Sequence, residues 1–271
     1  MRNFGHESNK RFDINSIYKK IFHLYKKVID KNELKIYYGL LYSEMSIMGK
    51  NIIIAIDGPA ASGKSTTAKR LAEELKFLYI DTGAMYRACA LYAIEHNTNL
   101  KDVSSVEDML NKIDILFKTI DNKNLIFLNN RDITDLIRTP EVSQKASEIA
   151  TIANVRHRMV YLQREMAKND SVIMDGRDIG SFVFPKADFK FFMVATLDAR
   201  TKRRQLEMQE KGLEVDYEQL KEELAWRDAN DANRDIAPLL KANDAVEVNT
   251  TTMSIEEQVD FILKKIREKV A

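Results

Sequence analysis

The chain has 271 residues, of which 45% are hydrophobic and 31% are charged, as in ordinary globular proteins. This length suits one large domain, or one domain with a small insertion. The formal net charge of +1 gives no electrostatic reason to expect binding to nucleic acid or to an anionic membrane. We therefore expect no nucleic-acid partner. The apolar runs are too short to span a bilayer, so we also expect no membrane span.

The single cysteine, Cys89, cannot form a disulfide within the chain, which agrees with a reducing compartment. It lies on an apolar helical stretch, where it is expected to act as a small buried hydrophobe. The N-terminus lacks the apolar core of a signal peptide. We therefore expect a cytoplasmic protein.

Residues 1–49 differ from the rest of the chain, because residues 1–50 contain ten Lys and Arg against five Asp and Glu. Apolar residues at heptad spacing predict a helix here, and they are Ile14, Ile17, Ile21, Leu24 and Val28. The segment is interpreted as a docking or membrane-surface helix, as a helix packed on the main domain or on a second copy, or as an extension upstream of a start at Met48. The expected state is a monomer, with self-association through this helix as the alternative.

A strand, a glycine-rich turn and a helix come next in the chain. Residues 51–57 form a short apolar run rich in β-branched side chains, which predicts a buried strand. Residues 66–76 carry Leu71 and Leu75 at helical spacing. The residues between them fit the phosphate-loop pattern G-x-x-x-x-G-K-[ST], and they are Gly58, Pro59, Ala60, Ala61, Ser62, Gly63, Lys64 and Ser65.

This order of elements places backbone N–H groups and a helix N-terminus around one concavity, which attracts phosphate. We expect Lys64 to reach the β- and γ-phosphates of a nucleotide and the Ser65 hydroxyl to bind Mg²⁺. Thr66, at the start of the helix, is expected to contact the nucleotide as well. The loop by itself does not distinguish a GTPase, an ATPase and a kinase.

From residue 51 onward, strands and helices alternate, which favours an α/β fold with a parallel sheet and helices on both faces. Four further strands are expected, at 78–81, 172–175, 189–195 and 245–249. A helix is expected at 84–96. Ser254 and Glu257 form a capping box that opens a last helix.

The stretch between the second and third core strands is too long for a single crossover helix. Within it, 113–120 and 125–129 predict a hairpin, and 141–168 predicts one or two long helices. We therefore expect an inserted α+β subdomain at roughly 97–170.

A guanine-reading motif, N-K-x-D, occurs at 111–114. In a GTPase this motif follows a core strand, whereas here it follows a helical stretch and runs into the predicted insertion. Asp175 also lacks the following x-x-G of a GTPase, since the next residues are Gly176, Arg177 and Asp178. We therefore discount a GTPase.

Arginines mark the ends of several predicted strands and a late helix, and they are Arg87, Arg138, Arg177, Arg200, Arg203, Arg204, Arg227 and Arg234. Ligands of open parallel sheets bind at the carboxyl ends of the strands, so Arg87 and Arg177 are expected to converge near the phosphate loop. Guanidinium groups hold phosphate oxygens and screen the repulsion between two anions. The pattern therefore favours a kinase whose acceptor carries a phosphate.

Such an acceptor needs no general base, because a phosphate monoester is largely dianionic at neutral pH, with a second pKa near ~6. The protein has only to align donor and acceptor and to stabilise charge on the transferred group. The histidines lie outside the strand-end motifs, so no catalytic role is expected for His6, His23, His96 or His157.

Five motifs in order resemble those of bacterial cytidylate kinases over residues 51 to about 270. They are I-D-G-P-A-A-S-G-K-S-T-T-A-K (56–69), Y-I-D-T-G-A-M-Y-R (79–87), I-R-T-P-E-V (137–142), D-G-R-D-I-G-S-F-V-F-P (175–185) and R-D-A-N-D-A-N-R-D-I-A-P-L (227–239). The resemblance implies a P-loop nucleoside monophosphate kinase fold at 50–271, with a five-stranded sheet, an acceptor-binding insertion and a lid at about 198–212. It also implies transfer from ATP to CMP or dCMP, with Mg²⁺.

The resemblance implies a role for individual residues. Lys64, Arg87, Arg177 and Arg234 match catalytic positions. Thr82 and Asp175 join Arg87, Arg177 and Arg234 around the acceptor phosphate, and Arg227 and Asp231 match the ribose site. Arg138 and Asp178 match the cytosine edge, where a guanidinium suits O2 and N3 and a carboxylate suits the N4 amino group. Arg200 and Arg203 match the lid over ATP.

Two departures from the family pattern stand out. Family members often carry more charge before Asp231 than the Trp226, Ala229 and Asn230 of this chain, and residues 1–49 have no counterpart. The alternatives are a kinase of the same fold acting on UMP, AMP or a non-nucleotide such as shikimate, and a nucleotide-dependent partner-binding module that docks through residues 1–49.

Overall fold

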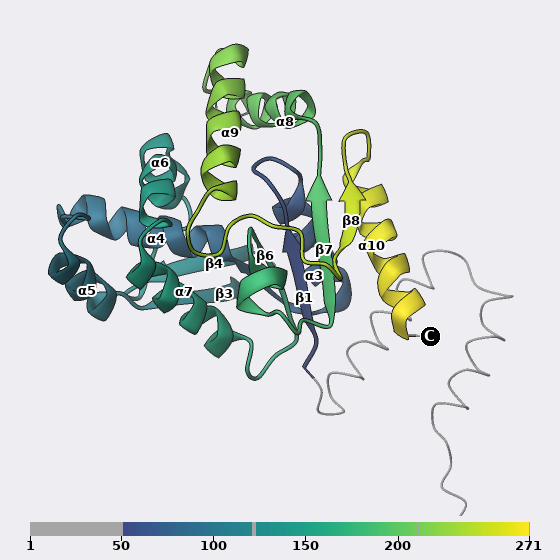
Figure 1. The fold of residues 1–271 in the computed structure, drawn as a ribbon, viewed down its shortest axis with the longest axis horizontal. Coiled ribbons are helices and arrows are strands. Elements are labelled where there is room, and N and C mark those ends of the chain that lie inside the picture. The colour runs from purple at the N-terminus through teal and green to yellow at the C-terminus, as the bar shows by residue number, and fades with distance from the viewer. Residues whose placement is uncertain (1–50, 121–122, 211, 271) are drawn as a thin grey trace, which may run out of the picture.

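The computed structural model describes residues 51–120, 123–210 and 212–270. At its centre is a five-stranded parallel sheet in the order β2-β6-β1-β7-β8 (Figure 1). The strands in chain order are β1 (Ile53–Asp57), β2 (Leu78–Asp81), β6 (Val172–Gly176), β7 (Phe189–Val194) and β8 (Val246–Asn249). The predicted parallel sheet is confirmed, and every strand begins and ends within two residues of its prediction.

Both faces of the sheet are covered, which explains why its strands read as continuous apolar runs. Ile54 and Ile56 pack against α3 (Lys64–Leu75) and α10 (Ile255–Val270) on one face. Ala55, between them, points to the other face, because successive side chains of a strand alternate. That second face is covered by α4 (Thr82–Glu95) and by helices of the segment that follows it.

The described part of the segment between α4 and β6 contains a small antiparallel sheet, three α-helices and one short 3-10 helix. Its elements are α5 (Val103–Lys112), β3 (Ile115–Ile120), β4 (Lys123–Leu128), β5 (Arg131–Asp132), the short η1 (Leu136–Arg138), α6 (Pro140–Ile149) and α7 (Ala153–Met166). The hairpin and the two helices are as predicted. Their buried side chains share one cluster with Met85 and Met174, so the segment packs directly onto the central sheet. The subdomain boundaries at 97 and 170 stay a prediction.

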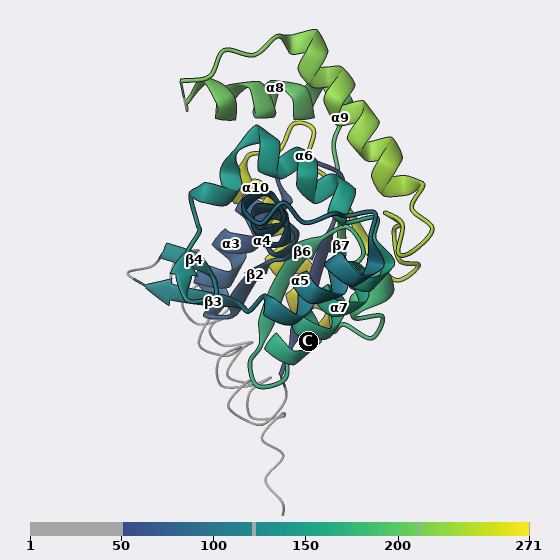
Figure 2. The same cartoon turned by 90° about the vertical axis from the view of Figure 1, so that its left-hand side faces the viewer.

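A helical hairpin follows β7, made of α8 (Leu197–Gln209) and α9 (Tyr217–Ala232). It projects from the side of the molecule toward which β7 points, and Figure 2 shows both helices beyond the rest of the fold. The predicted lid at 198–212 falls largely on α8.

The start of α10 confirms the predicted capping box. The Ser254 N–H donates to Glu257 Oε2 at 2.8 Å, and the Glu257 N–H donates to Ser254 Oγ at 3.2 Å. Cys89 is fully buried, as expected. Among the described residues, no helix has the length and apolarity that crossing a membrane requires. The helix predicted within residues 1–49 lies outside the described residues.

Candidate active site

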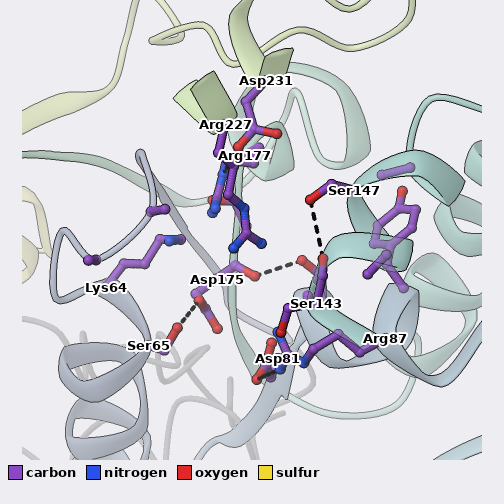
Figure 3. Close-up of a pocket in the computed structure, with 18 of the residues that line it drawn as sticks. Lys64, Ser65, Asp81, Arg87, Ser143, Ser147, Asp175, Arg177, Arg227 and Asp231 are labelled. Atoms are coloured by element: carbon purple, nitrogen blue, oxygen red, sulfur yellow. Dashed lines mark hydrogen bonds and ion pairs between the residues drawn. The ribbon is translucent and has the colours of Figure 1, made fainter. Parts of the chain in front are cut away.

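A cavity of about 450 Å³ lies at the carboxyl ends of β1, β2 and β6 and beneath α9. The helix N-termini of α3 and α4 open onto it, as expected for an open parallel sheet. Basic side chains dominate its lining, and they are Lys64, Arg87, Arg138, Arg156, Arg177, Arg204, Arg227 and Arg234. The predicted convergence of Arg87 and Arg177 near the phosphate loop is therefore observed (Figure 3).

The phosphate loop occupies the turn between β1 and α3, where glycine is required at two positions. Gly63 has a φ of 92°, in the left-handed region that favours glycine. A Cβ on Gly58 would collide with the backbone carbonyl of Met193. Ala60, Ala61, Gly63, Lys64, Ser65 and Thr66 line the cavity, whereas Gly58, Pro59 and Ser62 shape the loop from behind.

Lys64 lies at the start of α3 and is 6% exposed. Its Nζ donates to the Pro59 carbonyl at 3.0 Å, so the ammonium folds back over its own loop. Burial, followed by the nearby Arg177 guanidinium, lowers the pKa of Lys64 to about 7. A phosphate between these cations would remove that penalty, which makes this a site prepared for an anion.

Ser65 and Asp175 bring two oxygen donors together beside Lys64. The Ser65 hydroxyl donates to Asp175 Oδ2 at 2.6 Å, and Tyr79 Oη donates to Oδ1 at 2.8 Å (Figure 3). Burial, together with the Asp81 carboxylate, raises the pKa of Asp175. A hydroxyl and a carboxylate are the hard ligands that Mg²⁺ accepts alongside phosphate oxygens and water. The oxygens of Ser65 and Asp175 therefore have the donor chemistry that the expected Mg²⁺ requires.

Asp81 caps α4 and orients an arginine at the same edge of the sheet. Its Oδ1 accepts the Ala84 N–H at 2.8 Å, and its Oδ2 pairs with Arg87 Nη2 at 2.9 Å. Arg87 Nε is buried and has no hydrogen-bond partner among the described residues. The Thr82 hydroxyl donates a hydrogen bond to the backbone carbonyl of Asp175 at 2.7 Å. Arg87 is thus held by Asp81 at the edge of the sheet, where it lines the cavity.

Two arginines converge on Asp231 near the end of α9. Arg177 Nε lies 2.5 Å from Asp231 Oδ2, and Arg234 pairs with the other carboxylate oxygen. Arg234 lies just beyond the end of α9 at Ala232. Arg227, on the helix itself, lines the same wall of the cavity, and burial lowers its pKa to about 10.

An ion pair between Asp178 and Arg156 lies in the cavity lining, while the predicted contact of Arg138 and Asp178 with a base stays a prediction. Asp178 Oδ2 lies 2.5 Å from Arg156 Nη2, while Arg156 Nη1 donates to the Ala150 carbonyl at 3.2 Å. Arg156 is 1% exposed, whereas Arg138 is an exposed rim residue whose charge acts on Asp81. The structure therefore brings Asp178 together with Arg156, and it does not pair Asp178 with Arg138.

Sequence reasoning did not identify Arg156, Ser143 or Ser147 as site residues. The two serines lie one turn apart on α6 and face the cavity, with Ser147 Oγ donating to the Ser143 carbonyl at 3.3 Å (Figure 3). Arg156 lies on α7, away from every strand-end motif. The sequence offered one indication of a role for Arg156. It is a charged residue in a predicted helix beside residues that turn out to be buried and apolar, such as Val155 and Met159.

The arginines predicted in the lid contact the phosphate loop from behind rather than from the cavity. Arg200 Nη1 donates to the Ala60 carbonyl at 3.2 Å and pairs with Asp228 at 2.6 Å. Arg203 Nη1 donates to Thr250 Oγ1 at 3.1 Å and approaches the Ser62 carbonyl at 3.4 Å. Arg204, their neighbour, lines the cavity instead.

The discounted GTPase motif at 111–114 covers the end of α5 and the two residues before β3, away from the cavity lining. His96 and His157 do not line the cavity either. His6 and His23 lie outside the described residues. The predicted absence of a catalytic role for the histidines stays a prediction.

Comparison with known proteins identifies the family of the chain. The family described as cytidylate kinase matches residues 54–268. A cytidylate kinase of Caldicellulosiruptor bescii is 48% identical over 215 residues, which cover 79% of this chain and 95% of that protein. A cytidylate kinase of Bacillus cereus is 47% identical over 216 residues, covering 80% and 96%. The chain belongs to the cytidylate kinase family and is a nucleoside monophosphate kinase.

Proposed function

We propose that the cavity transfers the γ-phosphoryl group of ATP to CMP or dCMP, giving ADP and CDP or dCDP. The observation that carries this proposal is the arrangement of the cavity. A phosphate loop lies at one end, the buried Arg156–Asp178 pair lies at the other, and arginines line the space between them.

On the donor side, backbone N–H groups of the loop and Lys64 would hold the β- and γ-phosphates. The pKa of Lys64, lowered to about 7, supports this role, because an anion bound there restores the charged ammonium. Ser65 and Asp175 would hold Mg²⁺, which when bound neutralises charge on the phosphates.

On the acceptor side, Arg87, Arg177 and Arg234 would hold the phosphate of the monophosphate, with Thr82 beside them. Arg87 lines the cavity with a side chain that is 19% exposed, so its guanidinium can reach a phosphate oxygen there. The acceptor oxygen attacks as an anion, since the second pKa of a phosphate monoester is near ~6. Alignment and charge stabilisation then account for catalysis, and no protein base is needed.

Arg156 and Asp178 would read the base. A guanidinium donates to the O2 and N3 acceptors of cytosine, and a carboxylate accepts from the N4 amino group. Arg156 and Asp178 both line the cavity, so the paired side chains lie where a bound base could contact them. We therefore assign to Arg156 the role that sequence motifs suggested for Arg138. Arg227 and Asp231 would contact the sugar.

We further propose that the protein acts as a cytoplasmic monomer and that α8 and α9 close over the bound nucleotides. Closure would exclude water from the reacting phosphates. Arg204, on the cavity side of α8, is better placed to contact ATP than Arg200 or Arg203, which bind the backbone of the loop.

A coupled assay of ADP release with CMP, dCMP, UMP, AMP and GMP tests the proposal. We expect turnover to be stimulated by CMP and dCMP above the other acceptors. Absence of acceptor-stimulated turnover would contradict phosphoryl transfer, and turnover with AMP but not CMP would contradict the base assignment.

A further inference from the structure

Asp57 is the last residue of β1, and its side chain links the phosphate loop to a segment 122 positions later. One carboxylate oxygen accepts the backbone N–H of Ile179 at 2.8 Å, and the other accepts that of Gly180 at 2.7 Å. Asp57 is 5% exposed, so water does not compete for these bonds. Both carboxylate oxygens thus hold the backbone of Ile179 and Gly180, and we call this arrangement the clamp.

The clamped residues open η2 (Ile179–Val183), the helical turn that directly follows Arg177 and Asp178. The first N–H groups of a helical turn have no partner within the turn, and a negative charge is favourable there. Two later N–H groups of η2 bond back to the carbonyl of Asp178. Asp57 therefore holds the backbone from which Arg177 and Asp178 project into the acceptor side of the cavity.

The link is closely packed at Gly58 and in contact with neighbouring side chains at Gly180. Gly58, the next residue after Asp57, packs so closely on the Met193 carbonyl that even a Cβ would collide. On the other side, a Cβ on Gly180 would lie 3.1 Å from Lys190 Cδ and 3.4 Å from Asp57 Oδ2. If η2 moves, Arg177 and Asp178 therefore move relative to the phosphate loop.

We propose that Asp57 is a positioning residue that sets the distance between the phosphate loop and the turn carrying Arg177 and Asp178, and so aligns the two phosphates for in-line transfer. The inference rests on the proposed function of the cavity as a two-phosphate site. Asp57 touches neither substrate, so its effect is on the alignment of groups that do. Displacements on the order of 1 Å cost such reactions about 100-fold in rate.

The charges around Asp57 make the link sensitive to pH. Burial raises the pKa of Asp57 to about 7, with Asp178 adding to the rise and Arg177 opposing it. Lys190 also packs nearby, but its ammonium is bonded to the Pro185 carbonyl and to Asp244. A protonated carboxyl presents one O–H toward the two N–H groups, so protonation weakens the clamp.

The test is Asp57→Asn, which keeps the shape and removes one of the two acceptors. We expect kcat with saturating CMP and ATP to fall about 10- to 100-fold, while the ATP dissociation constant measured by calorimetry stays within about twofold. The ratio of wild-type to variant kcat should also shrink as pH falls from about 8 to about 6. Titration of the substrate phosphates cancels in that ratio.

Asp188→Asn is the matched control, because Asp188 Oδ2 accepts the N–H of Ile53 at 3.0 Å at the opposite end of the same strand. It should lose a similar amount of thermal stability while keeping kcat. Gly180→Ala crowds the same link and leaves Asp57 intact, so it should lower kcat even if Asp57→Asn does not fold.

The role of Asp57 is overturned if wild-type enzyme turns over CMP and Asp57→Asn loses no more kcat than Asp188→Asn. It is equally overturned if Asp57→Asn fails to fold and Gly180→Ala keeps wild-type kcat. A wild-type protein that is inactive with CMP overturns the proposed function instead, so the two failures are distinguishable.

Discussion

Arg156 and Asp178 form a buried ion pair at the far end of the cavity, with 2.5 Å between Arg156 Nη2 and Asp178 Oδ2. The pair joins α7 to the turn after β6, and the Ala150 carbonyl accepts a further guanidinium N–H. Burial raises the pKa of Asp178, and Arg156 opposes that rise. A buried charge pair of this kind is costly to desolvate, so its presence in a cavity favours a ligand-reading role over a stabilising one.

Replacing Arg156 with methionine should raise the KM for CMP and reduce discrimination against UMP, by about 1–3 kcal/mol in transition-state binding. The protein should also lose about 3 kcal/mol or more of unfolding free energy, because Asp178 stays buried without its partner. Steady-state kinetics with CMP and UMP, beside urea unfolding, measure both effects. Arg138→Ala is the informative comparison: if it alone abolishes CMP–UMP discrimination, the assignment from the sequence motif is right and that of Arg156 is wrong.

ATP binding should be accompanied by proton uptake at about pH 8, because the pKa of Lys64 in the free protein is lowered to about 7 and phosphates restore the ammonium. Calorimetric titration in two buffers of different ionisation enthalpy measures the uptake. Lys64→Met should abolish it and remove most of kcat. An uptake that persists in Lys64→Met would assign the proton to another group.

The lowered pKa of Lys64 also determines how the unfolding free energy changes with pH. Folding disfavours the charged form of Lys64, so between pH 7 and the ordinary value of 10.5 the unfolded chain binds this proton and the folded chain does not. The contribution of Lys64 to the unfolding free energy therefore rises with pH across that window. Thermal unfolding over the window should show wild-type stability rising relative to that of Lys64→Met as pH increases; a constant difference would contradict the shift.

Ser65→Ala should weaken the dependence of turnover on Mg²⁺, raising the Mg²⁺ concentration for half-maximal rate about 10-fold, with Asp175→Asn giving a comparable or larger change. Ser65→Thr keeps the hydroxyl and should retain the wild-type requirement. The measurement is turnover against free Mg²⁺ at saturating ATP and CMP. An unchanged requirement in Ser65→Ala would exclude this hydroxyl as a ligand.

The phosphate loop is supported from behind by Thr250, whose hydroxyl donates to the Ser62 carbonyl at 2.8 Å and accepts from Arg203 at 3.1 Å. Thr250→Val should cost about 1–3 kcal/mol of unfolding free energy, because a buried carbonyl and a guanidinium lose a partner. It should raise the KM for ATP more than that for CMP. Thr251→Val, which removes an exposed hydroxyl acceptor in the same loop, is the control. Equal effects of the two substitutions would contradict a specific support role.

Local sequence patterns predicted much of the fold and the donor half of the site. The run at 53–57 and the glycines at 58 and 63 act on their immediate neighbours in the chain, so their spacing alone predicts a strand, a phosphate loop and a helix. The strand-end arginines Arg87 and Arg177 were predictable for a related reason, since parallel strands end at one edge of a sheet.

The acceptor half depended on contacts that no local pattern encodes. Arg156 lies on a helix without a motif, 22 positions from Asp178, and only the packing of α7 against the central sheet brings them together. Arg138, which belongs to a recognisable motif, lies instead on the exposed rim. Arg200 and Arg203 carry the charge expected of a lid, but the tertiary structure turns them onto backbone carbonyls of the phosphate loop.

The sequence by itself therefore determined the sheet, the phosphate loop and the family, because these follow from residues that are neighbours in the chain. Only the tertiary structure decided which arginine pairs with Asp178 and which carboxylate links the phosphate loop to the turn after β6. The physical reason is that a side chain's function depends on burial and on its partner in space, and the pairs Arg156–Asp178 and Asp57–Gly180 are distant in sequence.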